Sequence, residues 1–148
     1  LARETDPPPS ETQVAVHTDF IGLKHSVVLC VDNEPDILEA MNLLLDRWGC
    51  RTVLLAETQA QAAQQVLKHG APDFVLMDYQ LNDQSNGLEV MRHLDNMLET
   101  RLPAIVITAD RSGELEESVK ARGYGLLRKP IRPAALRALM TNMMKTST

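Results

Sequence analysis

The chain has 148 residues, of which 44% are apolar and only 3% aromatic, so its core must be built from Leu, Val, Ile, Ala and Met. This length suffices for one domain with a real core and is too short for two ordinary domains. The net charge of −5 argues against nucleic-acid binding, and no apolar run reaches the roughly 18 residues of a membrane span, so we expect contact with neither partner.

The first part of the chain differs from the rest. The stretch DPPPSETQ is polar and proline-rich, and it cannot bury enough surface to offset the entropy of ordering it. We therefore predict a disordered linker at residues 1–24, one domain at residues 25–145 and a short tail at residues 146–148. Because the first residue is Leu and not Met, we expect the chain to be a piece of a longer protein.

From Ser26 onward, short apolar runs alternate with helical patterns. The runs are rich in β-branched residues and predict strands at Val27–Val31, Thr52–Leu55, Phe74–Met77, Ala104–Thr108 and Gly125–Leu127. Apolar residues at helical spacing predict helices at Asp36–Trp48, Thr58–His69, Gly87–Leu98, Gly113–Arg122 and Pro133–Met144. This alternation predicts an α/β fold, in which one parallel sheet is covered by helices on both faces.

Basic residues and cysteines add two expectations. From Lys120 to Thr148 there are seven Lys or Arg residues and no Asp or Glu, which we interpret as a solvated helix face, with a partner-docking face as the alternative. Cys30 and Cys50 both lie in apolar runs and lack a metal-type spacing. They predict two buried free thiols and a cytoplasmic location.

Polar residues stand where four of the predicted strands end. Asp32 and Asn33 follow the first strand, Asp78 the third and Lys129 the fifth, while Thr108 closes the fourth. Each residue alone is better explained as a cap, a turn residue or a surface residue. Together they predict one site, because ligands bind beyond the carboxyl ends of the strands in such sheets. Carboxylates without His or Cys favour Mg²⁺, and a lysine and a hydroxyl beside them favour phosphoryl transfer.

Four segments carry a family resemblance. VLCVDNEPDIL, FVLMDY, IVITAD and LLRKP resemble the signature segments of the receiver domain of two-component response regulators, and the similarity covers about residues 26–144. It implies a flavodoxin-like sheet of strand order 2-1-3-4-5 with five helices. More narrowly, the segments resemble receivers at the C-terminal end of hybrid sensor histidine kinases.

The resemblance also implies a metal site and a phosphoacceptor. Asp78 would accept a phosphoryl group from the phosphohistidine of a histidine kinase or histidine phosphotransfer domain, in cis or in trans. Asp32 and Asn33 would hold Mg²⁺ together with Asp78 and the backbone carbonyl of Gln80. Asn33 stands where most receivers carry a second Asp, so we expect weaker metal binding.

A conformational switch is implied by the same resemblance. Lys129 would bind one phosphate oxygen, in front of a cis bond to Pro130, and Thr108 would move to bind another. Leu126 stands where many receivers carry an aromatic switch residue, and Tyr124 comes two residues too early to replace it.

Other functions remain open at this point. A degenerate receiver, which binds a partner or dimerises without being phosphorylated, is favoured by Asn33 and Leu126. A small Mg²⁺-dependent hydrolase generally needs a second acid where this chain has Gln80. A nucleotide-binding module would need a Gly-rich loop after the first strand, which is absent.

Overall fold

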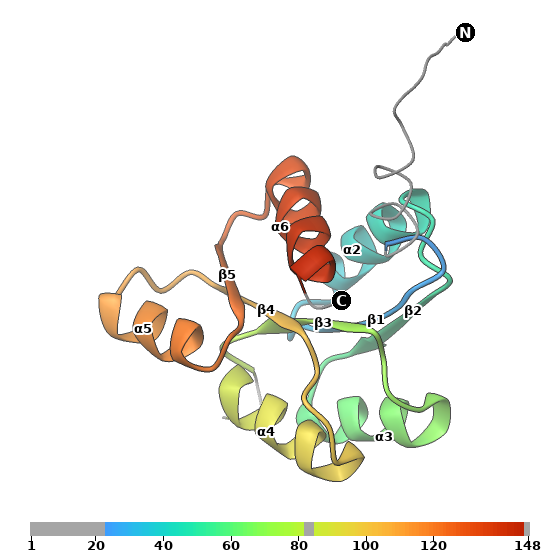
Figure 1. Ribbon diagram of the computed structural model, residues 1–148, viewed down its shortest axis with the longest axis horizontal. Helices are drawn as coiled ribbons and strands as arrows, with labels where there is room; N and C mark the ends of the chain where they lie inside the picture. Colours follow the sequence, from blue (N-terminus) through green and yellow to red (C-terminus); the bar gives the residue numbers. More distant parts are fainter. Residues whose placement is uncertain (1–22, 82–84, 147–148) are drawn as a thin grey trace, which may run out of the picture.

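The structure, a computed structural model, describes residues 23–81 and 85–146. Within these ranges, parallel strands form one sheet in the order β2-β1-β3-β4-β5 (Figure 1), which confirms the predicted topology. The strands are β1 (Val27–Val31), β2 (Thr52–Ala56), β3 (Phe74–Asp78), β4 (Ala104–Thr108) and β5 (Gly125–Arg128). The strand order reverses between β1 and β3, so the carboxyl ends of β1, β3 and β4 meet beside a crevice of the kind that binds ligands.

Helices cover both faces of this sheet, as the alternation of patterns predicts. The complete helices in the described ranges are α2 (Pro35–Arg47), α3 (Gln59–His69), α4 (Gly87–Leu98), α5 (Gly113–Ala121) and α6 (Pro133–Thr146). Figure 1 shows α2 and α6 on one face, with α3, α4 and α5 on the other. Because the strands are parallel, their carboxyl ends lie at one edge of the sheet, where polar groups from different strands can meet.

The element boundaries differ from the expected ones by one or two residues. Helix α2 begins at Pro35, one residue early, because proline at a first helical position gives up no hydrogen bond. Strand β3 extends to Asp78 and β5 to Arg128, so both polar residues keep ladder geometry. The backbones of these two residues are therefore held by the sheet.

Two apolar layers fill the space between the sheet and the helices. On the central strand β3, Phe74 and Leu76 point towards α2 and α6, whereas Val75 and Met77 point towards α3, α4 and α5. All four of these side chains are fully buried. Burial on both faces explains why the sequence of this strand shows no period-two alternation.

Residues 1–22 of the predicted linker and 147–148 of the predicted tail lie outside the described residues. The core begins before the predicted domain start, because Leu23 is only 2% exposed and packs in the layer under α2 and α6. Cys30 and Cys50 are free and buried in that layer, as predicted. None of the helices described is long and apolar enough to span a bilayer.

Candidate functional site

One lysine joins the predicted site residues at the carboxyl edge of the sheet. The Lys129 ammonium lies 3.5 Å from Asp32 Oδ2 and 3.5 Å from Asp78 Oδ1. Both carboxylates are buried, with exposed fractions of 1% for Asp32 and 4% for Asp78. Because parallel strands end at the same edge, residues that are about fifty or a hundred positions apart in the chain meet here. The structure thus brings together the residues that the strand ends predict.

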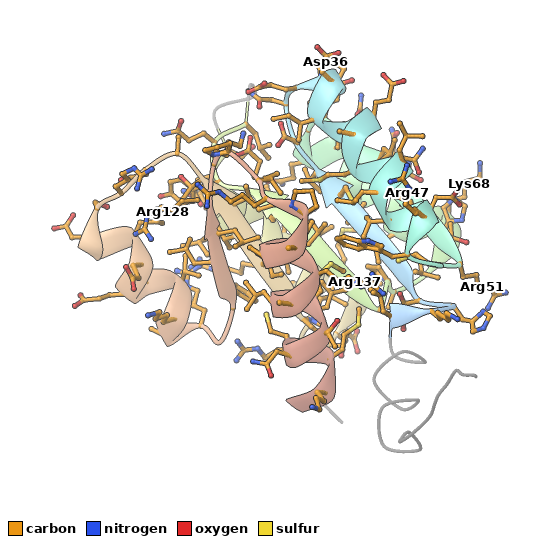
Figure 2. The ribbon with its side chains drawn as sticks, turned by 90° about the horizontal axis from the view of Figure 1, so that it is seen from above. Asp36, Arg47, Arg51, Lys68, Arg128 and Arg137 are labelled. Carbon is orange, nitrogen blue, oxygen red and sulfur yellow. The ribbon has the colours of Figure 1, made fainter. Side chains whose placement is uncertain are left out.

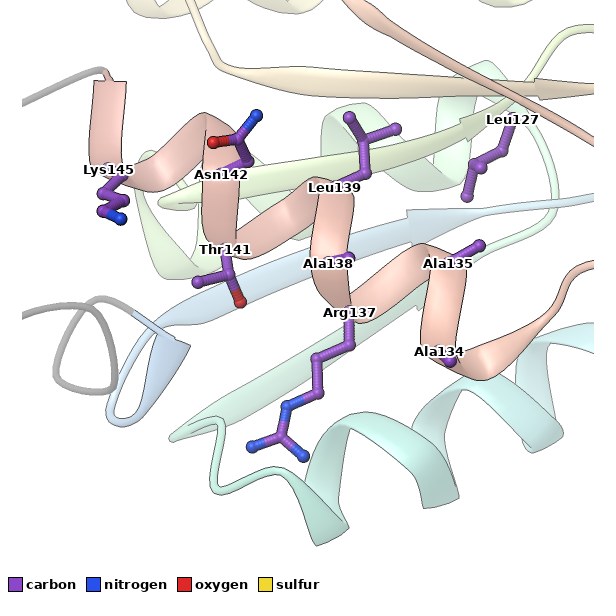
Figure 3. A pocket seen from close by; sticks show the side chains of 9 residues that line it. All are labelled: Leu127, Ala134, Ala135, Arg137, Ala138, Leu139, Thr141, Asn142 and Lys145. Carbon is purple, nitrogen blue, oxygen red and sulfur yellow. The ribbon is translucent and has the colours of Figure 1, made fainter. Parts of the chain in front are cut away.

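A small cavity of about 180 Å³ opens beside this lysine. It is lined by Asn33, Glu34, Asp78, Gln80, Thr108, Ala109 and Lys129. The predicted metal ligands that lie outside regular structure, Asn33 and Gln80, are therefore both at the cavity wall. A much larger open cavity of about 990 Å³ lies along α6 (Figure 3), but its lining holds none of the predicted site residues.

Burial disfavours the ionised form of both carboxylates, Asp32 and Asp78. The pKa of Asp78 is raised to about 6, first by burial and then by the nearby Asp32 carboxylate, while Lys129 and the backbone N–H of Gln80 act in the opposite direction. Burial also raises the pKa of Asp32, against the lowering effects of the Glu34 backbone N–H and Lys129. One ammonium therefore does not balance this site, and a second cation would stabilise it.

The oxygen atoms of Asp32 are unequally satisfied. Its Oδ1 accepts a hydrogen bond of 2.8 Å from the Glu34 backbone N–H. Its Oδ2 is buried without a hydrogen-bond donor, and Lys129 at 3.5 Å is the nearest recorded charge. A buried acceptor in this state is costly unless a ligand satisfies it. Its position fits a metal ion better than a closed structural contact.

The donor set at the cavity suits a hard cation. In residues 23–81 and 85–146, no group of three or more His, Cys, Asp or Glu side chains is placed to hold a metal. Asn33, Asp78 and Gln80 line the cavity, and Asp32 Oδ2 lies 3.5 Å from the ammonium of Lys129, which also lines it. Oxygen donors of this mixed kind are those that Mg²⁺ accepts, usually with several waters.

Thr108 is held in place by its own turn. Its hydroxyl oxygen accepts a hydrogen bond of 2.9 Å from the Asp110 backbone N–H, and the residue is 2% exposed. Its backbone carbonyl accepts a 2.8 Å bond from the Lys129 N–H, which ties β4 to the end of β5. The bond between Lys129 and Pro130 is cis, as predicted.

Gly87 lies so close to the backbone of Asp78 that a side chain would not fit there. A Cβ atom on Gly87 would lie 2.6 Å from the Asp78 carbonyl oxygen and 2.8 Å from Met77 Cγ. The Gly87 N–H donates a 2.7 Å bond to the Tyr79 carbonyl, and Asn86 caps helix α4 in a capping box. Sequence reasoning identified Gly87 only as a helix start. The Asn86-Gly87 pair, which follows Asp78 in the sequence, is the feature that could have indicated this close contact.

Leu126 occupies the position at which many receivers carry an aromatic switch residue. Leu126 packs against the layer under α3, α4 and α5, and Tyr124 is buried in the same layer. The Tyr124 hydroxyl lies 3.4 Å from Asp95 Oδ2, at the start of β5 and away from the cavity. Tyr124 therefore does not contact the residues of the site.

A family model described as the response regulator receiver domain matches residues 28–141. The chain belongs to this family. Receiver domains act in two-component phosphorelay signalling, interact with histidine kinases or phosphotransfer proteins and typically bind Mg²⁺ at the phosphorylation site.

Relatives of known identity agree with this receiver assignment. The phyllosphere-induced regulator PhyR of Methylorubrum extorquens is 27% identical over 117 residues, which are 79% of this chain and 43% of PhyR, so the receiver spans less than half of that relative. Chemotaxis protein CheY4 of Vibrio cholerae has a similar structure, with a TM-score of 0.71, 23% identity and coverage of 80% of this chain and 98% of CheY4. The receiver domain of Erythrobacter litoralis PhyR has a TM-score of 0.66 at 24% identity, covering 83% and 92%. The two solved structures show the fold.

Proposed function

We propose that Asp78 is the phosphoacceptor of this receiver, and that it takes a phosphoryl group from a phosphohistidine. The observation that supports this is the placement of Lys129, whose ammonium lies 3.5 Å from Asp78 Oδ1. A cation at that distance can neutralise charge on the transferring phosphoryl group. Asp78, Thr108 and Lys129 all line the small cavity, so they adjoin the space that a phosphoryl group would occupy.

Four groups would hold Mg²⁺ in this proposal: the side chains of Asp32, Asn33 and Asp78 and the backbone carbonyl of Gln80. When bound, the ion supplies positive charge that stabilises the phosphoryl oxygens. Lys129 then binds a phosphoryl oxygen, since it is already placed between the two carboxylates. Thr108 supplies a hydroxyl once it gives up its bond from Asp110.

Incubation with a small phosphodonor tests the proposal. The receiver is incubated with acetyl phosphate in the presence and absence of Mg²⁺, and its intact mass is measured. We expect a gain of one phosphoryl group that requires Mg²⁺ and is lost in Asp78→Asn. Asp36→Asn is the matched control, because Asp36 is exposed in the first turn of α2 and should leave the mass gain unchanged. An equal gain in Asp78→Asn would refute the assignment.

The cellular context is part of the same proposal. We place the receiver in the cytoplasm, at the C-terminal end of a hybrid sensor histidine kinase, with the histidine of that kinase or of a phosphotransfer domain as donor. Support comes from the proline-rich segment before the domain and from the resemblance of the signature segments to such receivers. Transfer of labelled phosphate from the parent kinase to Asp78, compared in cis and in trans, distinguishes the arrangements.

A second candidate is a degenerate receiver that binds a partner or a second copy without phosphorylation. Asn33 is the observation that favours it, because an amide at the cavity wall brings less negative charge for Mg²⁺ than a carboxylate. Leu136 and Met140 of α6 do not add support as a dimer surface, since both are fully buried in the core. Partner binding or dimerisation that is identical in wild type and Asp78→Asn would favour this candidate.

A further inference from the structure

Arg128, the last residue of β5, lies next to Thr108 on the same face of the sheet. The two residues are register partners in the parallel pairing of β4 and β5. The preceding pair on this face, Val106 and Leu126, packs in the layer under α3, α4 and α5. Side chains two positions further along a strand return to the same face. Thr108 and Arg128 therefore both project from the face that α5 covers.

One nitrogen atom of the Arg128 guanidinium, Nη2, has an acceptor, whereas another, Nε, has none. Its Nη2 lies 3.2 Å from Glu116 Oε1, and Figure 2 shows the side chain beside helix α5. Its Nε is buried and has no hydrogen-bond partner. A guanidinium presents a fixed fork of donors, so an unused buried N–H on it is available to a second acceptor.

This unused donor and an unused acceptor occur at the same edge of the sheet. Among the described residues, the buried side-chain polar atoms without a hydrogen bond are Asp32 Oδ2 and Arg128 Nε. Unsatisfied buried groups are rare in native proteins and call for an explanation. A cation beside Asp78 would satisfy the acceptor, and an anionic group at the same edge of the sheet would satisfy the donor.

Glu116 has a second ion-pair partner besides Arg128. Lys120, one turn further along α5, places its ammonium 2.8 Å from Glu116 Oε2. Both Glu116 and Lys120 are solvated, so their pairing is weak and exchangeable. Phosphorylation replaces the single negative charge of the ionised Asp78 carboxylate with up to two charges on the phosphoryl group, in a less exposed setting, and this group would compete with Glu116 for the Arg128 guanidinium.

We propose that Arg128 is a positioning residue that couples the charge at Asp78 to the position of helix α5. In the unmodified receiver Arg128 holds Glu116 and draws α5 against the end of β5. When Asp78 carries a phosphoryl group, the guanidinium turns towards the site, Glu116 keeps only Lys120, and α5 is released. This inference rests on the proposed function of Asp78.

Beryllofluoride with Mg²⁺, a non-covalent stand-in for the phosphoryl group, tests the coupling by amide NMR titration. In the wild type we expect shifts near Thr108 and along α5. In Arg128→Met, which keeps an aliphatic stem, the shifts near Thr108 should remain and those along α5 should be lost, while Arg128→Lys should restore them in part. In Glu116→Gln, the free protein should already show α5 amides moved towards their bound positions.

Affinity for beryllofluoride gives a second readout. Because an exposed ion pair is weak, Glu116→Gln should bind beryllofluoride about two- to fivefold more tightly than the wild type. Glu117→Gln is the matched control, since Glu117 is exposed on the same helix and should leave affinity unchanged. Wild-type α5 shifts in Arg128→Met, or equal affinities in the two Gln variants, would overturn the inference. No wild-type response near Thr108 would instead overturn the proposed function and, with it, this inference.

Discussion

The buried, ionised carboxylate of Asp78 should lower the free energy of unfolding of the metal-free receiver at neutral pH. Asp78→Asn removes that charge and should restore the lost stability. The carboxyl is 4% exposed and its pKa is raised from 3.8 to about 6, mainly by burial. Since the pKa is higher in the folded state, the folded protein holds more protons than the unfolded chain between these values. Its stability therefore falls as pH rises from about 4 to about 6, and the full cost is present above pH 6.

The size of the effect follows from the same values. Each pKa unit corresponds to about 1.4 kcal/mol, so the rise from 3.8 to about 6 costs at most about 3 kcal/mol of unfolding free energy at pH 7.5. The amide of Asp78→Asn fills nearly the same space and carries no charge. We therefore expect the variant to be more stable, with a melting temperature raised by about 2–4 °C for each kcal/mol recovered.

Urea unfolding in EDTA measures this difference at pH 7.5 and at pH 4. The stability gain of Asp78→Asn should be largest at pH 7.5 and should shrink towards zero at pH 4, where the wild-type carboxyl is protonated in the folded state. Added Mg²⁺ should stabilise the wild type and narrow the gap. The reasoning fails if the variant is no more stable at pH 7.5, or if its gain is the same at both pH values. Asp36→Asn, at an exposed position in the first turn of α2, should not raise the free energy of unfolding at either pH, because the Asp36 carboxylate favours the helix N-terminus.

Two further changes test the metal site and its support. Asn33→Asp should bind Mg²⁺ more tightly, with about 4 kcal/mol as the upper limit before desolvation, and equal affinities in calorimetric titration would show that Asn33 is not a ligand. Gly87→Ala should lose about 1–3 kcal/mol of unfolding free energy in urea, because its Cβ would meet the Asp78 carbonyl at 2.6 Å. Gly113→Ala, at the same position of α5 and with nothing within 4 Å, should change stability by less than about 1 kcal/mol; equal losses in the two variants would refute the steric argument.

The sheet and the site edge were predictable because polar site residues follow apolar runs at the ends of the predicted strands. Asp32 and Asp78 stand out in this way, and the parallel topology then places both beside Lys129. The pairing of Glu116 with Arg128 was not predictable. The two residues are twelve positions apart on two different elements, and the sequence alone indicates an exposed, solvated charge at each position. Such contacts depend on the exact path of α5 over the sheet, which periodicity does not determine.

The electrostatic cost of the site explains how one arrangement serves both folding and signalling. Asp32 and Asp78 are buried against a single lysine, so the metal-free fold carries charge repulsion that a cation relieves. By linkage, any free energy by which Mg²⁺ relieves this repulsion is also free energy by which the folded site binds Mg²⁺. Asn33 in place of a third acid lowers both quantities together. A receiver with this amide should therefore be more stable without metal and need more Mg²⁺ for phosphorylation, and neither change can occur without the other.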